Sequence, residues 1–136
     1  MTAITLRFLN HDKTVSLAPR EKPLMLTFWT TWCPDSQADL QLKQRLYLTA
    51  DSTKLDMYTV HVPGRETAGA DPASFYEKRG LSIPALQDEG RDLYDRWNLN
   101  GVPSTVFINQ KGEVTHVLGD QAKPEDIWRA LAETAG

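Results

Sequence analysis

A run of apolar side chains from Leu24 to Trp29, in which only Thr27 is polar, constrains the fold of this chain most. Polar and apolar positions do not alternate in it, so both faces of the strand it predicts must be covered. At six residues it is far shorter than the roughly 20 that a bilayer crossing needs, and no other stretch is long enough to span a membrane. The run therefore predicts a central parallel strand in an α/β protein with helices on both faces of its sheet.

Strand and helix patterns on either side of this run predict a mixed sheet between helices. The other predicted strands are residues 4–9, 14–17, 55–62, 105–108 and 113–118, with a short extended piece at 81–86. The predicted helices are residues 34–48, 71–79 and 89–97, and a last helix that begins at Pro124. A polar turn joins the first two strands, which therefore predict an N-terminal β-hairpin on the edge of the fold.

Helical spacing also predicts which faces are buried. In the first helix, the side chains expected to pack on the sheet are those of Ala38, Leu42, Leu46 and Thr49. The polar residues elsewhere on this helix, Lys43 among them, are expected to meet water. In the last helix, the side chains expected to cover the sheet are those of Ile127 and Leu131, with Trp128 as a further candidate.

Length and composition exclude several classes of function. The 136 residues predict one domain, residues 1–136, and the hydrophobic (40%) and charged (24%) fractions are close to globular averages. A net charge of −3 provides no basic field, so no nucleic-acid partner is expected. One cysteine excludes an intrachain disulfide and a zinc site of paired thiolates, and the three histidines are far apart. No metal or other cofactor is expected. The protein is expected to be a monomer.

The N-terminal residues 1–8 bear on location. They alternate like a strand and lack the charged start, apolar run and cleavage site of a secretory signal. This pattern predicts a cytoplasmic protein, or an extracytoplasmic one if a leader has been removed.

The only cysteine, Cys33, directly follows the apolar strand and precedes a helix that Pro34 is suited to begin. Free backbone N–H groups and the helix dipole stabilise a thiolate at such an end, where cysteine pKa values fall from about 8.5 to between about 3.5 and 7.5. A lone cysteine is otherwise most often an inert core residue. The position predicts an exposed nucleophile, although the carboxylate of Asp35 in the first turn opposes its ionisation.

One motif contains this cysteine and two others follow it later in the chain: Phe28-Trp29-Thr30-Thr31-Trp32-Cys33-Pro34-Asp35-Ser36, Gly101-Val102-Pro103-Ser104-Thr105 and Phe107-Ile108-Asn109-Gln110-Lys111-Gly112. Together they resemble the thioredoxin superfamily, and most closely its TlpA/ResA-like thiol-disulfide oxidoreductase branch. The strand and helix between residues 60 and 80 and the segment 93–97 resemble the same branch. The resemblance implies a thioredoxin fold, with a central mixed β-sheet flanked by helices on both faces, an N-terminal β-hairpin and an inserted β-α segment.

The resemblance also implies a function and a site. The Cys33 thiolate would attack protein disulfides through a mixed-disulfide intermediate, and a cis Val102–Pro103 peptide bond would face it across the site. Backbone groups near Val102 would then pair with an extended peptide. Trp32 and Pro34 would complete the substrate surface. The expected partners are protein disulfide substrates and an external thiol or thiol reductant.

Ser36 stands where dithiol members of the superfamily carry their resolving cysteine, so an external thiol must release the mixed disulfide. Its hydroxyl could donate a hydrogen bond to the Cys33 thiolate or could help to cap the helix. The sequence leaves open whether Ser36 belongs to a natural monothiol protein or is a laboratory Cys-to-Ser substitution that traps mixed disulfides.

A second departure from the superfamily concerns the carboxylate that assists proton transfer. Thr27 stands six residues before Cys33, where ordinary thioredoxins have a buried Asp. The TlpA/ResA-like branch is thought to supply a Glu from its inserted segment instead, and Glu66 is the candidate proton acceptor here. The alternative for Glu66 is a solvated side chain in a polar loop.

Two other functions compete with the oxidoreductase. The first is a redox-inactive thioredoxin-like module that keeps the groove for extended peptides. The second is a one-cysteine peroxidase, because Thr30 stands three residues before Cys33; however, Leu26 occupies the position where that pattern requires Pro.

Overall fold

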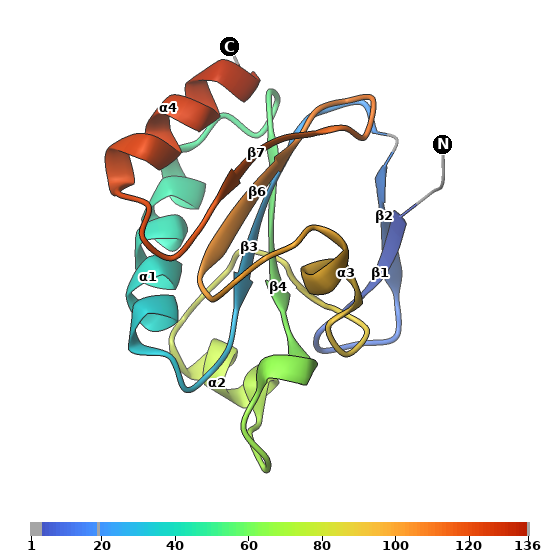
Figure 1. Cartoon of the computed structure of the whole chain (residues 1–136), viewed down its shortest axis with the longest axis vertical. Helices are drawn as coiled ribbons and strands as arrows, with labels where there is room; N and C mark the ends of the chain where they lie inside the picture. Colours follow the sequence, from blue (N-terminus) through green and yellow to red (C-terminus); the bar gives the residue numbers. More distant parts are fainter. Residues whose placement is uncertain (1–3, 19, 136) are drawn as a thin grey trace.

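The computed structural model describes residues 4–18 and 20–135; residues 1–3, which begin the alternating N-terminal segment, lie outside it. Seven strands form one sheet in the order β2-β1-β5-β4-β3-β6-β7 (Figure 1). The strands are β1 (Ile4–Phe8), β2 (Thr14–Ala18), β3 (Leu24–Trp29), β4 (Asp56–His61), β5 (Ala85–Gln87), β6 (Ser104–Ile108) and β7 (Val114–Leu118). The helices are α1 (Pro34–Thr49), η1 (Pro63–Arg65), α2 (Pro72–Lys78), α3 (Asp92–Arg96) and α4 (Pro124–Ala135). The predicted α/β thioredoxin fold is confirmed.

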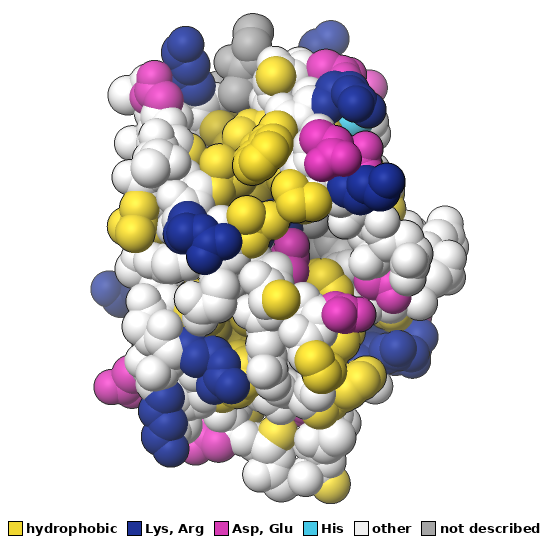
Figure 2. Space-filling model, turned by 90° about the vertical axis from the view of Figure 1, so that its left-hand side faces the viewer, with side chains coloured by type: hydrophobic (Ala, Val, Ile, Leu, Met, Phe, Trp, Pro, Cys, Tyr) yellow, Lys and Arg dark blue, Asp and Glu magenta, His cyan; other side chains and the backbone are white. Residues whose placement is uncertain are grey.

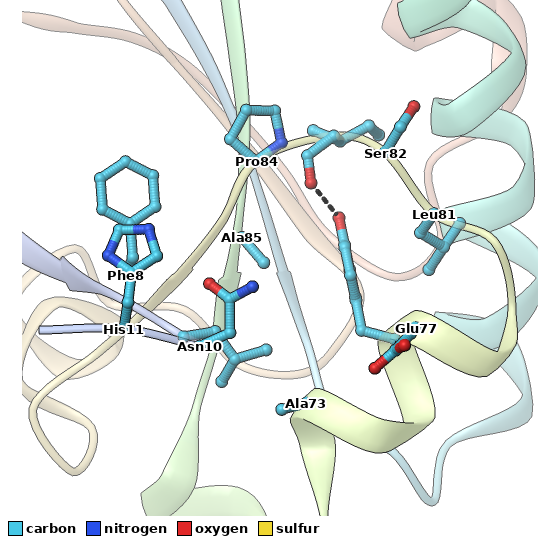
Figure 3. A pocket seen from close by; sticks show the side chains of 12 residues that line it. Phe8, Asn10, His11, Ala73, Glu77, Leu81, Ser82, Pro84 and Ala85 are labelled. Carbon is cyan, nitrogen blue, oxygen red and sulfur yellow. Dashed lines mark hydrogen bonds between the residues drawn. The ribbon is translucent and has the colours of Figure 1, made fainter. Parts of the chain in front are cut away.

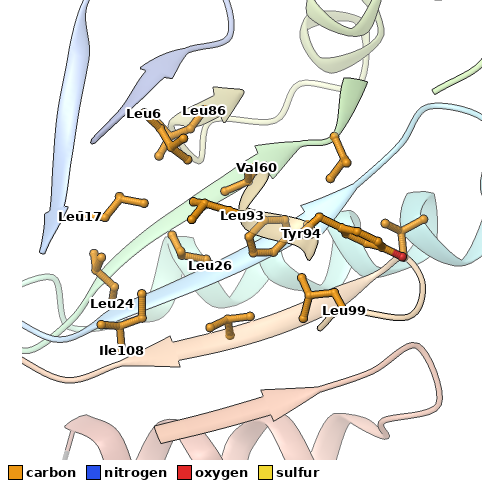
Figure 4. Packing of buried hydrophobic residues seen from close by; sticks show 14 of the residues in the cluster. Leu6, Leu17, Leu24, Leu26, Val60, Leu86, Leu93, Tyr94, Leu99 and Ile108 are labelled. Atoms are coloured by element: carbon orange, nitrogen blue, oxygen red, sulfur yellow. The ribbon is translucent and has the colours of Figure 1, made fainter. Parts of the chain in front are cut away.

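Strand β3 is the central strand that its apolar run predicts. It pairs parallel to β4 and antiparallel to β6, and all six of its residues are buried. Leu24, Leu26 and Phe28 pack in a core cluster with residues of α3, part of which Figure 4 shows. The alternate residues Met25 and Trp29 pack in two clusters with α4, α1 and α2. Because successive side chains of a strand point to opposite faces, one apolar run thus serves both layers.

The N-terminal hairpin and the inserted segment lie where they were predicted. β1 and β2 pair antiparallel, and β2 forms one edge of the sheet. β4 and α2 follow α1, and α2 begins at Pro72 with Asp71 as its N-cap. Gly80, which follows this helix, has a φ of 65°, a left-handed conformation that glycine adopts without steric cost. The insertion adds β4 beside β3 and brings η1 next to the end of β3.

The predicted buried face of α1 is only partly right: Leu46 packs, partly buried, against the core cluster that contains Ile127. Ala38 and Thr49 are exposed, whereas the fully buried positions are Ser36, Leu40 and Lys43. Both sets of residues are spaced by three and four, so the spacing alone does not distinguish them. The prediction failed at these positions because it placed Lys43 in water, whereas Lys43 finds its hydrogen-bond partners inside the protein.

In α4, Ile127 is buried and Leu131 is partly buried in the cluster that lies under this helix, as predicted. Trp128 does not cover the sheet, because 52% of its surface is exposed. Figure 2 views the molecule from the α1 and α4 side and shows exposed hydrophobic side chains gathered in its upper half. No helix in the described ranges is both long and apolar enough to cross a membrane.

Candidate active site

Cys33 is the N-cap residue of α1, and its backbone is extended, with φ −87° and ψ 116°. Its carbonyl accepts the first helical hydrogen bond from the Gln37 backbone N–H at 3.1 Å, and Pro34 follows it as the first helical residue. The expectation that Cys33 is exposed is wrong, because only 8% of its surface is accessible. The reason is that the loop before β6 packs against it: the Cys33 thiol donates to the Val102 carbonyl oxygen at 3.5 Å.

The residues predicted to bind substrate divide into two groups. Val102 and Pro103 are buried, and the peptide bond between them is cis. Trp32 and Pro34 flank Cys33 in the chain and are exposed, Trp32 by 46%. The fold thus places Val102 against the sulfur and leaves an aromatic side chain open to solvent beside it.

Ser36 makes neither of the hydrogen bonds considered for it. The residue is 0% exposed, and its Oγ has no hydrogen-bond partner among the described residues. Helix α1 also has no side-chain hydrogen bond at its N-cap. A buried hydroxyl without a partner costs about 1–3 kcal/mol. Ser36 therefore fills the position of a resolving thiol without satisfying its own polar group.

Glu66 is not a solvated loop residue, since its side chain is only 7% exposed. Its carboxylate accepts hydrogen bonds from the Thr31 backbone N–H at 2.8 Å and the Thr31 hydroxyl at 2.7 Å. It also contacts His61 Nε2 at 2.8 Å and accepts from the Thr67 backbone N–H at 2.9 Å. Among the described residues, Cys33 is not one of its partners, so these contacts hold the loop before Cys33 to the segment after β4.

His61, a buried histidine at the end of β4, completes this network. Burial lowers its pKa, against the hydrogen bond and charge of Glu66, which act in the opposite direction. Burial acts to raise the pKa of Glu66, but the hydrogen bonds from Thr31, His61 and Thr67 outweigh it and lower that pKa overall. The pair is therefore a carboxylate that accepts a hydrogen bond from the Nε2–H of a neutral imidazole.

Two further hydrogen bonds fix the loop. Trp32 Nε1 donates to the Arg65 carbonyl oxygen at 2.9 Å, and Gln37 Nε2 donates to the Thr31 carbonyl oxygen at 3.0 Å. Thr30 adds no such contact, because its buried Oγ1 has no partner in the part of the chain that the structure describes. The loop from Thr31 to Cys33 is thus held from the η1 side and from the first turn of α1.

Sequence reasoning missed Lys43, whose ammonium is buried between α1 and the sheet. It contacts Thr27 Oγ1 at 3.1 Å, Thr105 Oγ1 at 2.9 Å and Asp39 Oδ2 at 2.9 Å. Burial lowers the pKa of Lys43, and the charge and hydrogen bond of Asp39 offset only part of this. The one available signal was Thr27, a polar residue in a strand that is otherwise apolar on both faces.

A pocket lies apart from this site. Its volume is about 390 Å³, and it lies between the β1–β2 turn, α2 and the segment before β5 (Figure 3). Phe8, His11, Tyr76 and Pro84 contribute to its walls, and neither Cys33 nor a residue hydrogen-bonded to it lines the pocket. No cluster of three His, Cys, Asp or Glu side chains that could hold a metal ion occurs in the described ranges.

Comparison with known proteins agrees with these features. A sequence profile described as the AhpC/TSA family matches residues 2–117. Thiol-disulfide oxidoreductase ResA from Oceanobacillus iheyensis is 28% identical over 108 residues, which are 79% of this chain and 55% of that protein. ResA from Geobacillus kaustophilus is 28% identical over 112 residues, which are 82% of this chain and 63% of that protein. The chain thus spans less than two thirds of the length of these relatives.

Among solved structures, StoA from Bacillus subtilis superimposes with a TM-score of 0.80 at 20% identity and covers 94% of this chain and 95% of that one. A thiol-disulfide isomerase from Corynebacterium glutamicum superimposes with a TM-score of 0.83 at 17% identity and covers 100% of this chain and 95% of that one. At these identities the likeness concerns the fold alone.

Proposed function

Since the chain belongs to the AhpC/TSA family and its relatives support the predicted TlpA/ResA-like branch, we propose that it is a thiol-disulfide oxidoreductase acting on protein disulfides through Cys33. One observation carries the proposal: the only thiol of the chain caps a helix and lies against the Val102 carbonyl, directly before Pro103. A helix N-terminus supports a thiolate, and the adjoining backbone can receive an extended peptide.

Two exchanges at Cys33 form and release the mixed disulfide. The Cys33 thiolate attacks one sulfur of a substrate disulfide, the S–S bond breaks, and the other sulfur leaves as a thiolate. An external thiolate then attacks the mixed disulfide, so that Cys33 leaves as a thiolate again and the substrate sulfur stays bound to the external thiol. A second external thiol completes the reduction by displacing that sulfur, and the two external thiols become a disulfide. Ser36 takes part in neither exchange because it has no thiol.

Burial of Cys33 means that a substrate must displace part of its cover. The thiol donates to Val102 O in the free protein, and ionisation removes that hydrogen and ends the hydrogen bond. A substrate strand that pairs with the backbone of Val102 would come close to the sulfur, and the residue before Cys33 is the exposed Trp32. Trp32 is held by Arg65 and offers an apolar edge next to the thiol.

Glu66 acts in this proposal as a positioning residue and not as the proton acceptor first considered. Its oxygens are occupied by donors from Thr31, Thr67 and His61, and its lowered pKa makes it a weak base. Through Thr31 it determines where the loop presents Cys33. Replacing Glu66 with Gln would therefore slow the reaction of Cys33 at every pH and leave the pH midpoint of that reaction nearly unchanged.

The redox-inactive peptide-binding module remains the second candidate, and the 8% exposure of Cys33 is the observation that favours it. The test is the rate of Cys33 alkylation as a function of pH, together with insulin disulfide reduction by this chain and by a Ser36→Cys variant. An alkylation midpoint below about pH 7.5, with reduction that requires an external thiol in this chain and is faster in Ser36→Cys, would support the oxidoreductase. A midpoint near pH 8.5 without turnover in either protein would refute it and support the binding module.

A further inference from the structure

Lys43 is a buried cation that the proposed exchange chemistry does not use. Its side chain is 0% exposed, and its Nζ contacts three oxygens, those of Asp39, Thr27 and Thr105. An ammonium has three N–H donors, so these contacts can use all of them. Burying a charged group is costly unless its charge and its hydrogen bonds are both compensated, and both conditions are met here.

The three partners of Lys43 come from the three elements that build the candidate active site. Thr27 lies in β3, the strand that leads to Cys33, and Thr105 lies in β6, two residues after Pro103. The two threonines are paired directly across β3 and β6. Asp39 lies in α1, the helix that Cys33 caps. One ammonium thus joins the strand before the thiol, the strand after Pro103 and the helix itself.

Lys43 provides the positive charge that balances the largely buried carboxylate of Asp39. Two carboxylates lie in the first two turns of α1, and both oppose formation of a thiolate at its N-terminus. Asp35 is exposed, so water screens its charge, but the Asp39 side chain is only 12% exposed. A charge removed from water acts over a longer distance because the surrounding dielectric is lower. Without a cation beside it, Asp39 would hinder ionisation of Cys33 more strongly than Asp35 does.

We propose that Lys43 is a positioning residue that neutralises the buried charge of Asp39 and so permits Cys33 to ionise. The inference rests on the proposed function, in which Cys33 reacts as a thiolate. The other titratable groups that surround Cys33 are Asp35 in the first turn, the Glu66–His61 pair behind the loop, and Tyr94, which packs in the same core cluster. They are unchanged in the variants described below and do not contribute to the differences.

The test compares Lys43→Met with Asp39→Asn by the pH dependence of Cys33 alkylation in the full chain. Side chains of a helix point toward its N-terminus, so ten residues at about 1.5 Å each place the ammonium roughly 10 Å from Cys33. A unit charge at that distance, with an effective dielectric of about 20, shifts the midpoint by about one pH unit. Lys43→Met is expected to raise the midpoint by this amount, Asp39→Asn to lower it, and the double variant to stay near the original value.

Opposite shifts distinguish an electrostatic role from a structural one, because a displaced helix would move both midpoints in the same direction. The control is Thr59→Val, which removes the buried hydrogen bond between Thr59 and Tyr76, 3.1 Å long, from the neighbouring strand β4. It should lower stability and leave the midpoint unchanged. If Lys43→Met does not fold, Lys43→Gln takes its place, because it removes the charge and keeps a hydrogen-bond donor.

Midpoints that do not move, or that move together, would overturn the role of Lys43. The failure of the proposed function would have a different result: an ordinary midpoint near pH 8.5 and no turnover in the unmodified and Ser36→Cys proteins, whatever the shifts in the variants.

Discussion

Replacing Ser36 with Ala should stabilise the protein, although the substitution removes a buried polar atom. Ser36 is the third residue of α1, is fully buried, and its Oγ has no partner among the described residues. Alanine removes the unpaired hydroxyl, whose burial costs about 1–3 kcal/mol, and has the higher helix propensity. The small void left by one oxygen offsets part of this gain. We expect the free energy of unfolding to rise by about 1 kcal/mol.

Urea denaturation at pH 7, followed by circular dichroism, measures this change, and a thermal scan should show Tm higher by about 3–5 °C for a domain of this size. The matched control is Ser104→Ala. Ser104 is also buried, but its hydroxyl donates to the Gly101 carbonyl oxygen at 2.6 Å. Losing this hydrogen bond should lower stability by about 1 kcal/mol. If Ser36→Ala destabilised the protein as much as Ser104→Ala does, Ser36 Oγ would have a partner in solution and the reasoning would be refuted.

Three further predictions concern stability. The lowered pKa of His61 means that the unfolded chain binds more protons below about pH 6.5, so stability should fall from pH 7 to pH 5, and His61→Phe should flatten that slope in urea titrations. Leu40→Ala should cost about 3 kcal/mol and Leu48→Ala less than about 0.5 kcal/mol, because Leu40 is fully buried and Leu48 is 70% exposed; similar costs would contradict the observed face of α1. Asp88→Ala should cost about 2 kcal/mol, because the buried Asp88 carboxylate accepts hydrogen bonds from two backbone N–H groups of α3; an unchanged urea midpoint would exclude this capping role.

The elements of the fold were predictable because their signals are local. The bounds of β3 are the bounds of its apolar run, and Pro34 and Pro72 each stand at the first position of a helix. β6 and β7 lie where strands were predicted, on either side of the segment Asn109-Gln110-Lys111-Gly112. Each of these signals depends on residues within one element, where backbone geometry and side-chain period act directly.

The candidate site was predictable only in part. The family resemblance predicted that the motif around Cys33 and the segment at Val102 lie close together. The structure brings the Cys33 sulfur and the Val102 oxygen into contact. Burial of Cys33 was not predicted, because the residue that covers it lies 69 positions away in the chain. The compartment in which the protein works stays a prediction of its N-terminal residues.

The sequence by itself determined the order of strands and helices, the central place of β3, and the position of the only thiol at the N-terminus of α1. The tertiary structure alone decided how polar groups are paired. Lys43 was assigned to water, but Thr105, 62 positions away, provides one of its acceptors. Glu66 was assigned either the role of proton acceptor or a solvated position, and Thr31, 35 positions away, donates to it. The pattern of polar and apolar residues along the chain predicts which positions face water. It does not predict a buried charge, which is stable only when the fold brings it partners from other elements.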